Sequence, residues 1–207
     1  MTRDLEKRIE RLEDTIEIYN LQSRYNFYLT MYMGKQAVNE LFADHLDVCN
    51  VINGGRWVGK ESVMRMFANL DQVYKEMPGR MGSIMAIQPL ITFSDDGSGA
   101  DGQRFGMDPS VLPVKNSEED LEHLEALWMF GRYHCKYIKQ KGVWKILQLG
   151  FSLHFLSSPD KGWVEQTQPH YVRPFESEEG GDPDTPKTFP DLYSPEGPNR
   201  YGPKPPE

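Results

Sequence analysis

Two long segments of alternating apolar and polar residues, joined at Lys141-Gly142, constrain the fold of this chain most strongly. They run from Ala126 to Leu156 and are rich in aromatic and β-branched side chains. A period of two that is interrupted by a glycine-containing turn predicts a β-hairpin. Strands of about ten residues exceed the usual length of about five or six. We therefore expect the hairpin to belong to a large, strongly curved sheet.

The distribution of proline divides the chain into a folded domain and an extended arm. Eleven of the 15 prolines lie at or after Pro159, and 38% of all 207 residues are hydrophobic. We expect a domain over residues 1–157, which is long enough for one core with a pocket inside it. Residues 158–207 form a proline-rich arm. Its aromatic residues predict packing on its own domain or on a neighbouring subunit, with disorder as the alternative.

The net charge of −8 argues against some classes of partner. Nucleic-acid binding requires a basic face, so we expect no nucleic acid. Adsorption to an anionic membrane is disfavoured as well, and no apolar run approaches the length of a membrane span. Cys49 and Cys135 lack the spacing of a metal site and fit a reducing compartment. We therefore expect a cytoplasmic protein. The sequence has no HxxxH, CxxC or carboxylate triad at ligand spacing and no glycine-rich phosphate loop after a strand, so we expect no metal or cofactor.

Residues 4–33 have the periodicity of one long helix. Apolar residues recur at spacings of 4, 3, 4 and 3 with charged residues between them, which is typical of a coiled-coil face. We call this set the apolar seam, and it predicts contact with a partner chain. The seam consists of Leu5, Ile9, Leu12, Ile16 and Tyr19. Farther along, Tyr25, Tyr28 and Tyr32 share one face, and because buried hydroxyl groups need hydrogen-bond partners, they predict a polar edge to a cavity.

The remaining elements alternate in type in the manner of an α+β fold. The expected helices cover 36–42 and 60–74, and the expected strands cover 45–52, 56–58, 81–93 and 99–107. Residues 108–120 contain two prolines and an acidic run, so we expect a loop there. The predicted order is α-α-β-β-α-β-β-β-β with antiparallel neighbours. Helices would pack on one face of a bent sheet.

Four stretches in this order resemble the landmarks of SnoaL-like proteins in the nuclear transport factor 2-like superfamily. They are NELFADHLDV, GGRWVGKESVMRMF, QPLITFSDDGSGA and GRYHCKYIKQKGVWKI. The resemblance implies a cone-shaped, half-open barrel with an apolar pocket between the helices and the concave face of the sheet. It also implies lyase, isomerase or carrier activity, since the superfamily includes dehydratases, steroid isomerases, dehydrochlorinases, polyketide cyclases and non-catalytic carriers. Most of these enzymes need no cofactor.

This chain departs from the commonest catalytic pattern of that superfamily. The resemblance implies an Asp near the end of the first helix, where this chain has Thr30-Met31-Tyr32. It implies a His on a later strand, where this chain has Gly82-Ser83-Ile84-Met85. We therefore expect proton transfer without a standard Asp–His pair, with the tyrosines of the first helix contributing.

Two histidines, one tyrosine and one arginine are the candidate catalytic residues. His154 shares its strand parity with Trp144, so we expect it to face into the cone, and His45 lies at the entrance of the first strand. Imidazole exchanges protons near neutral pH and suits a general base. Tyr25 would act with His154 as acid or base, and Arg80 would hold an anion. The expected substrate-binding residues are Tyr28, Tyr32, Trp57, Trp128, Tyr133, Trp144 and Gln148.

These residues favour a lyase or isomerase that acts on a small aromatic or polycyclic molecule by general acid–base catalysis. Dehydration, isomerisation and retro-aldol cleavage with release of formaldehyde remain open at this stage. The alternative is a non-catalytic module that binds a small apolar or phenolic molecule or serves in assembly. We also expect a homo-oligomer, either a dimer or a trimer.

Overall fold

The computed structural model describes residues 2–52, 55–87, 89–114, 123–166, 182–185 and 193–197. The helices are α1 (Thr2–Thr30), α2 (Gly34–Leu41), α3 (Lys60–Lys75) and α4 (Gly162–Glu165). The first strands are β1 (Cys49–Ile52), β2 (Gly55–Val58), β3 (Met81–Gly82), β4 (Met85–Ala86) and β5 (Leu90–Phe93). Three long strands follow, β6 (Gly99–Val114), β7 (His123–Gln140) and β8 (Val143–Ser157).

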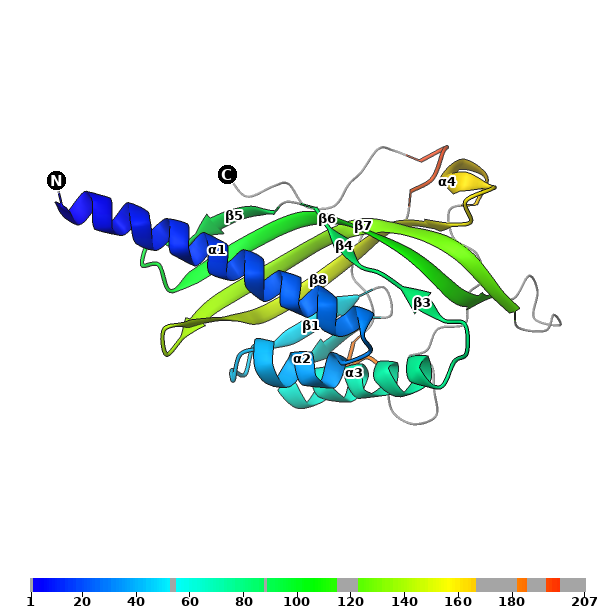
Figure 1. Ribbon diagram of the computed structural model, residues 1–207, viewed down its shortest axis with the longest axis horizontal. Coiled ribbons are helices and arrows are strands. Elements are labelled where there is room, and N and C mark those ends of the chain that lie inside the picture. Colours follow the sequence, from blue (N-terminus) through cyan, green and yellow to red (C-terminus); the bar gives the residue numbers. More distant parts are fainter. Residues whose placement is uncertain are drawn as a thin grey trace.

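The strands form one strongly curved, unclosed sheet, and α1, α2 and α3 lie on its concave side (Figure 1). The strand order is β2-β1-β8-β7-β6-β3, and β4 and β5 also pair with β6. This α+β arrangement confirms the cone-shaped, half-open barrel. The hairpin is confirmed as β7 and β8, which turn at Lys141-Gly142, where both residues have positive φ angles of 52° and 79°. Paired positive φ values match the twist of the flanking strands.

Two β-bulges in β8 change which of its residues face the concave side. Ile146 pairs with Tyr137 and Gln148 pairs with Lys136, so Leu147 is an extra residue between the two pairs. The same occurs at His154, because Leu153 pairs with Gly131 and the next pair on β8 is Phe155 with Phe130. Each extra residue reverses the in–out alternation beyond it and bends the strand.

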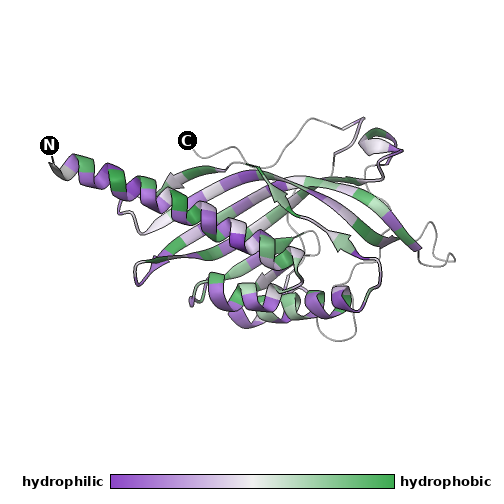
Figure 2. Cartoon of the chain, viewed as in Figure 1, coloured by the Kyte–Doolittle hydropathy of each residue, from purple (hydrophilic) through white to green (hydrophobic). Residues whose placement is uncertain are grey.

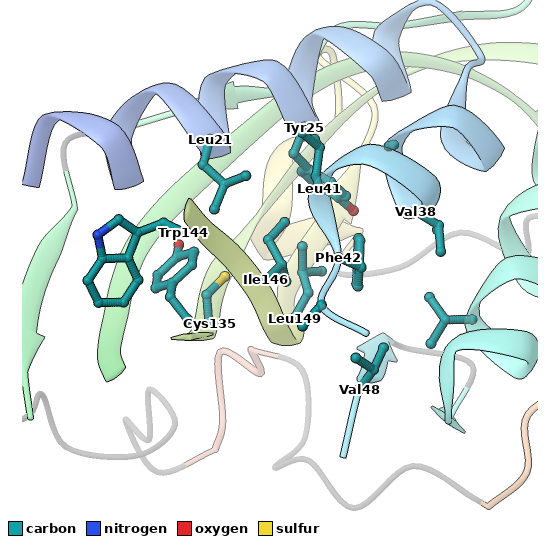
Figure 3. Packing of buried hydrophobic residues seen from close by; sticks show 14 of the residues in the cluster. Leu21, Tyr25, Val38, Leu41, Phe42, Val48, Cys135, Trp144, Ile146 and Leu149 are labelled. Atoms are coloured by element: carbon teal, nitrogen blue, oxygen red, sulfur yellow. The ribbon is translucent and has the colours of Figure 1, made fainter. Parts of the chain in front are cut away.

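The core lies between the concave face and the helices. The long strands alternate between hydrophobic and hydrophilic residues (Figure 2), so one face meets the helices and the other faces outward. In Figure 3, Tyr25 of α1 and Leu41 of α2 lie above Ile146 and Leu149 of β8. Ile146 and Leu41 are fully buried. Burial of such apolar side chains stabilises the packing of the three helices, whose other faces are polar, on the sheet.

Two expectations about the sheet are wrong, and the sheet is mixed rather than wholly antiparallel. Residues 108–114 form no loop but continue β6, where Val114 pairs with His123 of β7; residues 115–122 lie outside the described part. The single strand expected over 81–93 is divided into β3, β4 and β5, and Pro89 precedes the last of them. Strand β1 runs parallel to β8 rather than antiparallel, through the pairs that join 49–51 to 148–150.

Two described pieces of the proline-rich arm contact the domain of the same chain. Thr185 forms an antiparallel bridge with Arg56 of β2, and the Tyr193 backbone N–H donates to the carbonyl oxygen of His154 at 2.8 Å. The carboxylate of Asp184 accepts hydrogen bonds from the Val58 N–H at 2.6 Å and from the Ser62 hydroxyl at 2.7 Å. Asp184 thereby connects this piece of the arm to the end of β2 and to a side chain in the first turn of α3.

We expect Asp184→Ala to lower the free energy of unfolding by about 1 kcal/mol, because the hydrogen bonds from the Val58 N–H and the Ser62 hydroxyl are lost. The measurement is chemical denaturation followed by circular dichroism. Asp182→Ala removes an exposed carboxylate two residues away and serves as the matched control. Identical unfolding midpoints for the two variants would contradict a stabilising role of these Asp184 hydrogen bonds.

Candidate active site

A cavity of about 170 Å³ lies between the C-terminal half of α1, helix α3 and the concave face of the sheet. Most of its wall is apolar. The apolar lining residues are Leu29, Ile52, Met66, Phe67, Leu70, Ile84, Met107, Leu112, Met129, Leu149 and Phe151. The polar and aromatic lining residues are Tyr25, Thr30, Tyr32, Asn50, Asp71, Tyr74, Arg80, Asp108 and Tyr133. A largely apolar pocket with a few polar groups is the usual form of a small-molecule site.

Asn50 brings an unsatisfied amide to this cavity. Its side chain is 1% exposed, and neither its nitrogen nor its oxygen has a hydrogen-bond partner in the part of the chain that the structure describes. It lies on β1 directly beside Leu149 of β8, which lines the same cavity. An unpaired buried amide costs free energy, so its retention here favours a role in contacting a ligand.

Asp108 is one of two carboxylates that line the cavity, and the other, Asp71, accepts hydrogen bonds from the backbone N–H groups of Gly34 and Lys35 at 2.7 Å and 2.9 Å. Asp108 lies on β6 opposite Met129, and its Oδ1 accepts a hydrogen bond of 2.7 Å from the backbone N–H of Ser83. Burial raises the pKa of this carboxyl group, against the opposing effects of the Ser83 hydrogen bond and the nearby charge of Arg80. A buried carboxyl with a raised pKa in a cavity is a candidate general acid or base.

Two tyrosines project into the same space from opposite walls. Tyr25 of α1 packs against Phe42 and Phe67 with ring centroids 6.4 Å and 6.2 Å away, and Tyr133 of β7 packs against Phe151 at 4.7 Å. Burial raises the pKa of both phenols, and the charge of Asp108 raises that of Tyr133 further. Both hydroxyl groups therefore remain protonated at neutral pH and can donate hydrogen bonds.

A pair of glycines makes room for the Tyr133 ring. Gly106 and Gly131 are partners on neighbouring strands, and a Cβ atom on Gly106 would lie 2.7 Å from the Tyr133 ring. A Cβ atom on Gly131 would lie 2.6 Å from the ring of Phe151. The two rings can therefore lie close to the sheet backbone, which only glycine allows.

Arg80 forms part of the opposite wall. Its guanidinium lies 3.9 Å from the centre of the Tyr74 ring and donates a hydrogen bond of 3.0 Å to the carbonyl oxygen of Val111. Tyr32 donates to the backbone carbonyl oxygen of Arg80 at 3.3 Å. These contacts hold the Arg80 cation at the cavity, where it acts on the charge of Asp108.

A second guanidinium lies buried beside the tyrosines. Arg104 of β6 is 5% exposed and donates to the hydroxyl of Tyr137, which donates to Gln22 of α1 at 3.2 Å. No carboxylate forms an ion pair with Arg104 among the described residues. Its charge opposes the rise in the pKa of Tyr25 and Tyr133, so it favours negative charge at this end of the site.

Four of the expected site residues line the cavity, namely Tyr25, Tyr32, Arg80 and Tyr133. Five of the others lie elsewhere. Tyr28 donates to Glu40 on the surface side of α1, and Trp144 donates to Asp14 at 2.8 Å. Trp57 is fully buried in the core, and Trp128 lies on β7 opposite Pro109. His45 is exposed, and its Nδ1 accepts from the Asp47 backbone N–H at 3.1 Å.

The orientation expected for His154 and Gln148 is wrong. His154 packs against Phe105 and Phe130 at 6.3 Å and 5.6 Å, on the side of the sheet away from the cavity. Gln148 pairs with the exposed Lys136. Both residues share a parity with Trp144 in the sequence, but the bulge at Leu147 reverses the alternation beyond it. Leu149 and Phe151 face the cavity instead.

Asp108 and Asn50 are polar cavity residues that the sequence analysis missed, and Thr30, Asp71 and Tyr74 are others. Asp108 shares the parity of Arg104 and Gly106, and this alternation could have extended the strand past Pro109. Asn50 offered a weaker signal, as a polar residue within an otherwise apolar strand segment. No cluster of three or more His, Cys, Asp or Glu residues suited to a metal ion occurs among the described residues.

A family model described as SnoaL-like domain matches residues 10–149. The chain therefore belongs to the SnoaL-like domain family, and the recognised resemblance is confirmed. No match is found among curated proteins. None of the helices in the described part combines the length and apolar character that a membrane span requires.

Solved structures with the same fold include proteins with enzymatic names. A type 2 hexachlorocyclohexane dehydrochlorinase, LinA, is 15% identical with a TM-score of 0.57, over 80% of this chain and 97% of that one. A protein from Novosphingobium aromaticivorans DSM 12444, proposed to be a scytalone dehydratase, is 14% identical with a TM-score of 0.55, over 77% and 94%. A proposed aromatic ring hydroxylase from N. aromaticivorans is 17% identical with a TM-score of 0.55, over 71% and 94%. Identities this low establish a shared fold only.

We expect Asp108→Asn to raise the unfolding midpoint at pH 7. A carboxyl whose pKa is raised by folding lowers the stability as the pH rises from its ordinary pKa to the raised pKa, because the unfolded chain releases the proton first, and the full loss remains at higher pH. The amide keeps an oxygen for the Ser83 N–H and carries no charge. The gain should disappear below the ordinary pKa of 3.8, where the carboxyl is neutral in both states.

Thermal unfolding between pH 3 and pH 8 provides the measurement, within the range where unfolding is reversible. Asp101→Asn removes an exposed carboxylate on the same strand and is the control. A stability gain of equal size at every pH would contradict a raised pKa at Asp108.

Proposed function

We propose that this protein is a cofactor-independent lyase that acts on a small, single-ring molecule by general acid–base catalysis. The observation that carries the proposal is Asp108, a carboxylate with a raised pKa in an apolar cavity beside Tyr133. A carboxyl group with a raised pKa exchanges protons at a pH closer to neutral. The lyase and isomerase classes both need such a group, and the names dehydratase and dehydrochlorinase among the fold relatives favour elimination.

The cavity volume supports a substrate with one ring rather than several. Its volume of about 170 Å³ is close to the roughly 150 Å³ of an engineered apolar cavity that accommodates benzene. Pockets for larger, drug-sized ligands measure about 300 Å³ or more. Met66, Phe67 and Phe151 would contact the faces and edges of such a ring.

The polar residues divide the chemical steps between them. Asp108 removes a proton from carbon, and the electron pair left behind forms the new double bond as the leaving group departs. Asn50, Tyr25 and Tyr133 donate hydrogen bonds to the oxygen on which negative charge develops, and Arg104 favours that charge from behind the tyrosines. The proton taken by Asp108 then passes to the leaving group, so dehydration releases water and restores the carboxylate.

A phenolic ring would assist this route. Its own oxygen can accept the developing charge as a phenolate or quinone-like intermediate, which removes the need for a histidine base. The same first steps support isomerisation, or retro-aldol cleavage with release of formaldehyde, if the electron pair moves differently. Tyr25 and Tyr133, which stay protonated at neutral pH, suit the role of phenolate partners.

The second candidate function is binding without chemistry. The favouring observation is that none of the described residues that line the cavity is a histidine, the most common general base. Asn50 and the tyrosines would then fix the orientation of a bound phenol or small carbonyl compound. Asp108 separates the two candidates, because a carrier has no need of a proton-accepting group.

The test begins with a panel of hydroxylated, chlorinated and phenolic ring compounds, screened for thermal stabilisation and then for conversion by mass spectrometry. For a compound that is converted, we expect Asp108→Asn to lower kcat by about 10²- to 10⁴-fold, the contribution of a positioned base. Binding should change little, because Asn keeps the size and the hydrogen bond from Ser83. Tyr133→Phe should lower kcat less, since Tyr25 and Asn50 remain as donors.

The exposed Asp101→Asn variant is the matched control and should keep full activity. The mass of the product identifies the reaction: loss of water or hydrogen chloride, loss of formaldehyde, or no change for an isomer. Tight binding without conversion of any stabilising compound would favour the carrier. Full activity of a folded Asp108→Asn protein would refute the assignment of the base.

A further inference from the structure

The N-terminal half of α1 carries a row of apolar side chains that the domain does not cover. Four residues of the apolar seam lie on this row, and Figure 2 shows hydrophobic positions recurring along this part of the helix. Their exposed fractions are 54% for Leu5, 47% for Ile9, 65% for Leu12 and 58% for Ile16. Large aliphatic side chains exposed in register along one helix face indicate an interaction surface.

The opposite face of the helix is the one that packs on the domain. Asp14 accepts a hydrogen bond from the Trp144 indole at 2.8 Å and forms an ion pair with Lys139 at 2.7 Å. Ile18, one turn farther along, is fully buried. Successive residues of an α-helix advance by about 100°, which places the seam on the side away from Asp14 and Ile18. Helix α1 also extends past the sheet at its N-terminal end (Figure 1).

The order of side chains in the seam favours one kind of partner. In heptad notation the spacing places Ile9 and Ile16 at a positions and Leu5 and Leu12 at d positions. A β-branched residue at heptad position a, combined with Leu at position d, favours a parallel, two-stranded coiled coil. A second copy of this chain supplies the same combination.

The flanking charges favour the same arrangement. Arg8 lies at a g position and Glu13 at the following e position, and both are exposed. In a parallel pair, g of one helix faces the next e of the other, so Arg8 of one copy would meet Glu13 of its partner. An antiparallel pair would bring e positions together, and these are Glu6 and Glu13, which repel.

We propose that two copies of this chain associate through residues 5–16 of α1 as a short parallel coiled coil. Packing of α1 on its own domain already orders the helix, so the pair forms without the entropy cost of folding it. The two domains then lie on opposite sides of the paired helices. The cavity is lined by residues from Tyr25 onward and stays accessible. The surface is independent of the proposed chemistry.

The first experiment tests the apolar contact by sedimentation equilibrium over a range of concentrations. The wild-type protein should show a monomer–dimer equilibrium, and Leu12→Asp should be monomeric throughout, with an unchanged melting temperature at concentrations where the wild type is also monomeric. Leu46→Asp places the same change at a site that is 91% exposed and lies outside α1, and it should dimerise like the wild type. A wild-type protein that is monomeric or trimeric, or a Leu12→Asp variant that still dimerises normally, would overturn the proposal.

The second experiment tests the parallel orientation by exchanging charges. Arg8→Glu and Glu13→Arg should each weaken self-association by about tenfold, since each replaces two attractive pairs with two repulsive ones. An equimolar mixture of the two variants should dimerise as well as the wild type, because every g–e' pair is again opposite in charge. Failure of the mixture to recover dimerisation, while both single variants are weakened, would refute the parallel arrangement.

Discussion

The architecture depends on the pairing of β7 with long strands on both of its edges. Sixteen residue pairs join it to β6, from Gly99 with Ile138 to Val114 with His123, and β8 pairs along the other edge. Strands of this length accumulate twist, and the bulges at Leu147 and His154 add a bend. The resulting concave face is too wide for side chains of the sheet alone to fill. Helices α1, α2 and α3 close most of it and leave the cavity at one end.

The cavity keeps polar groups that the stability of the fold alone does not require. Asn50 and Asp108 would each be replaced with benefit to stability by a residue that needs no hydrogen bond and carries no charge. Proteins retain such costly groups at functional sites, where pre-organised polar atoms meet a ligand. The dense aromatic packing of Tyr25 and Tyr133 holds their hydroxyl groups in place, so a bound molecule would meet donors that need little rearrangement.

Arg104 contributes both to the packing of α1 on the sheet and to the electrostatics of the cavity. Its guanidinium is buried, and its hydrogen bond to Tyr137 continues to Gln22 of α1. Charge interactions are stronger in this poorly solvated interior than at the surface. The same residue therefore positions α1 over the sheet and makes the tyrosine end of the cavity favourable for an anion.

The sequence alone determined the α+β class, the β7–β8 hairpin and the cavity positions of Tyr25, Tyr32, Arg80 and Tyr133, because periodicity and the family landmarks are local signals. It did not determine which face His154 and Gln148 occupy, since a bulge at Leu147 inserts one residue and reverses the parity without a mark in the sequence. The site residues Asn50 and Asp108 emerged only in three dimensions. Asp108 is the first residue of the segment where two prolines suggested a loop, and pairing with β7 keeps that segment in the sheet. Its raised pKa is a product of burial, and burial is a property of the assembled fold rather than of any short stretch of chain.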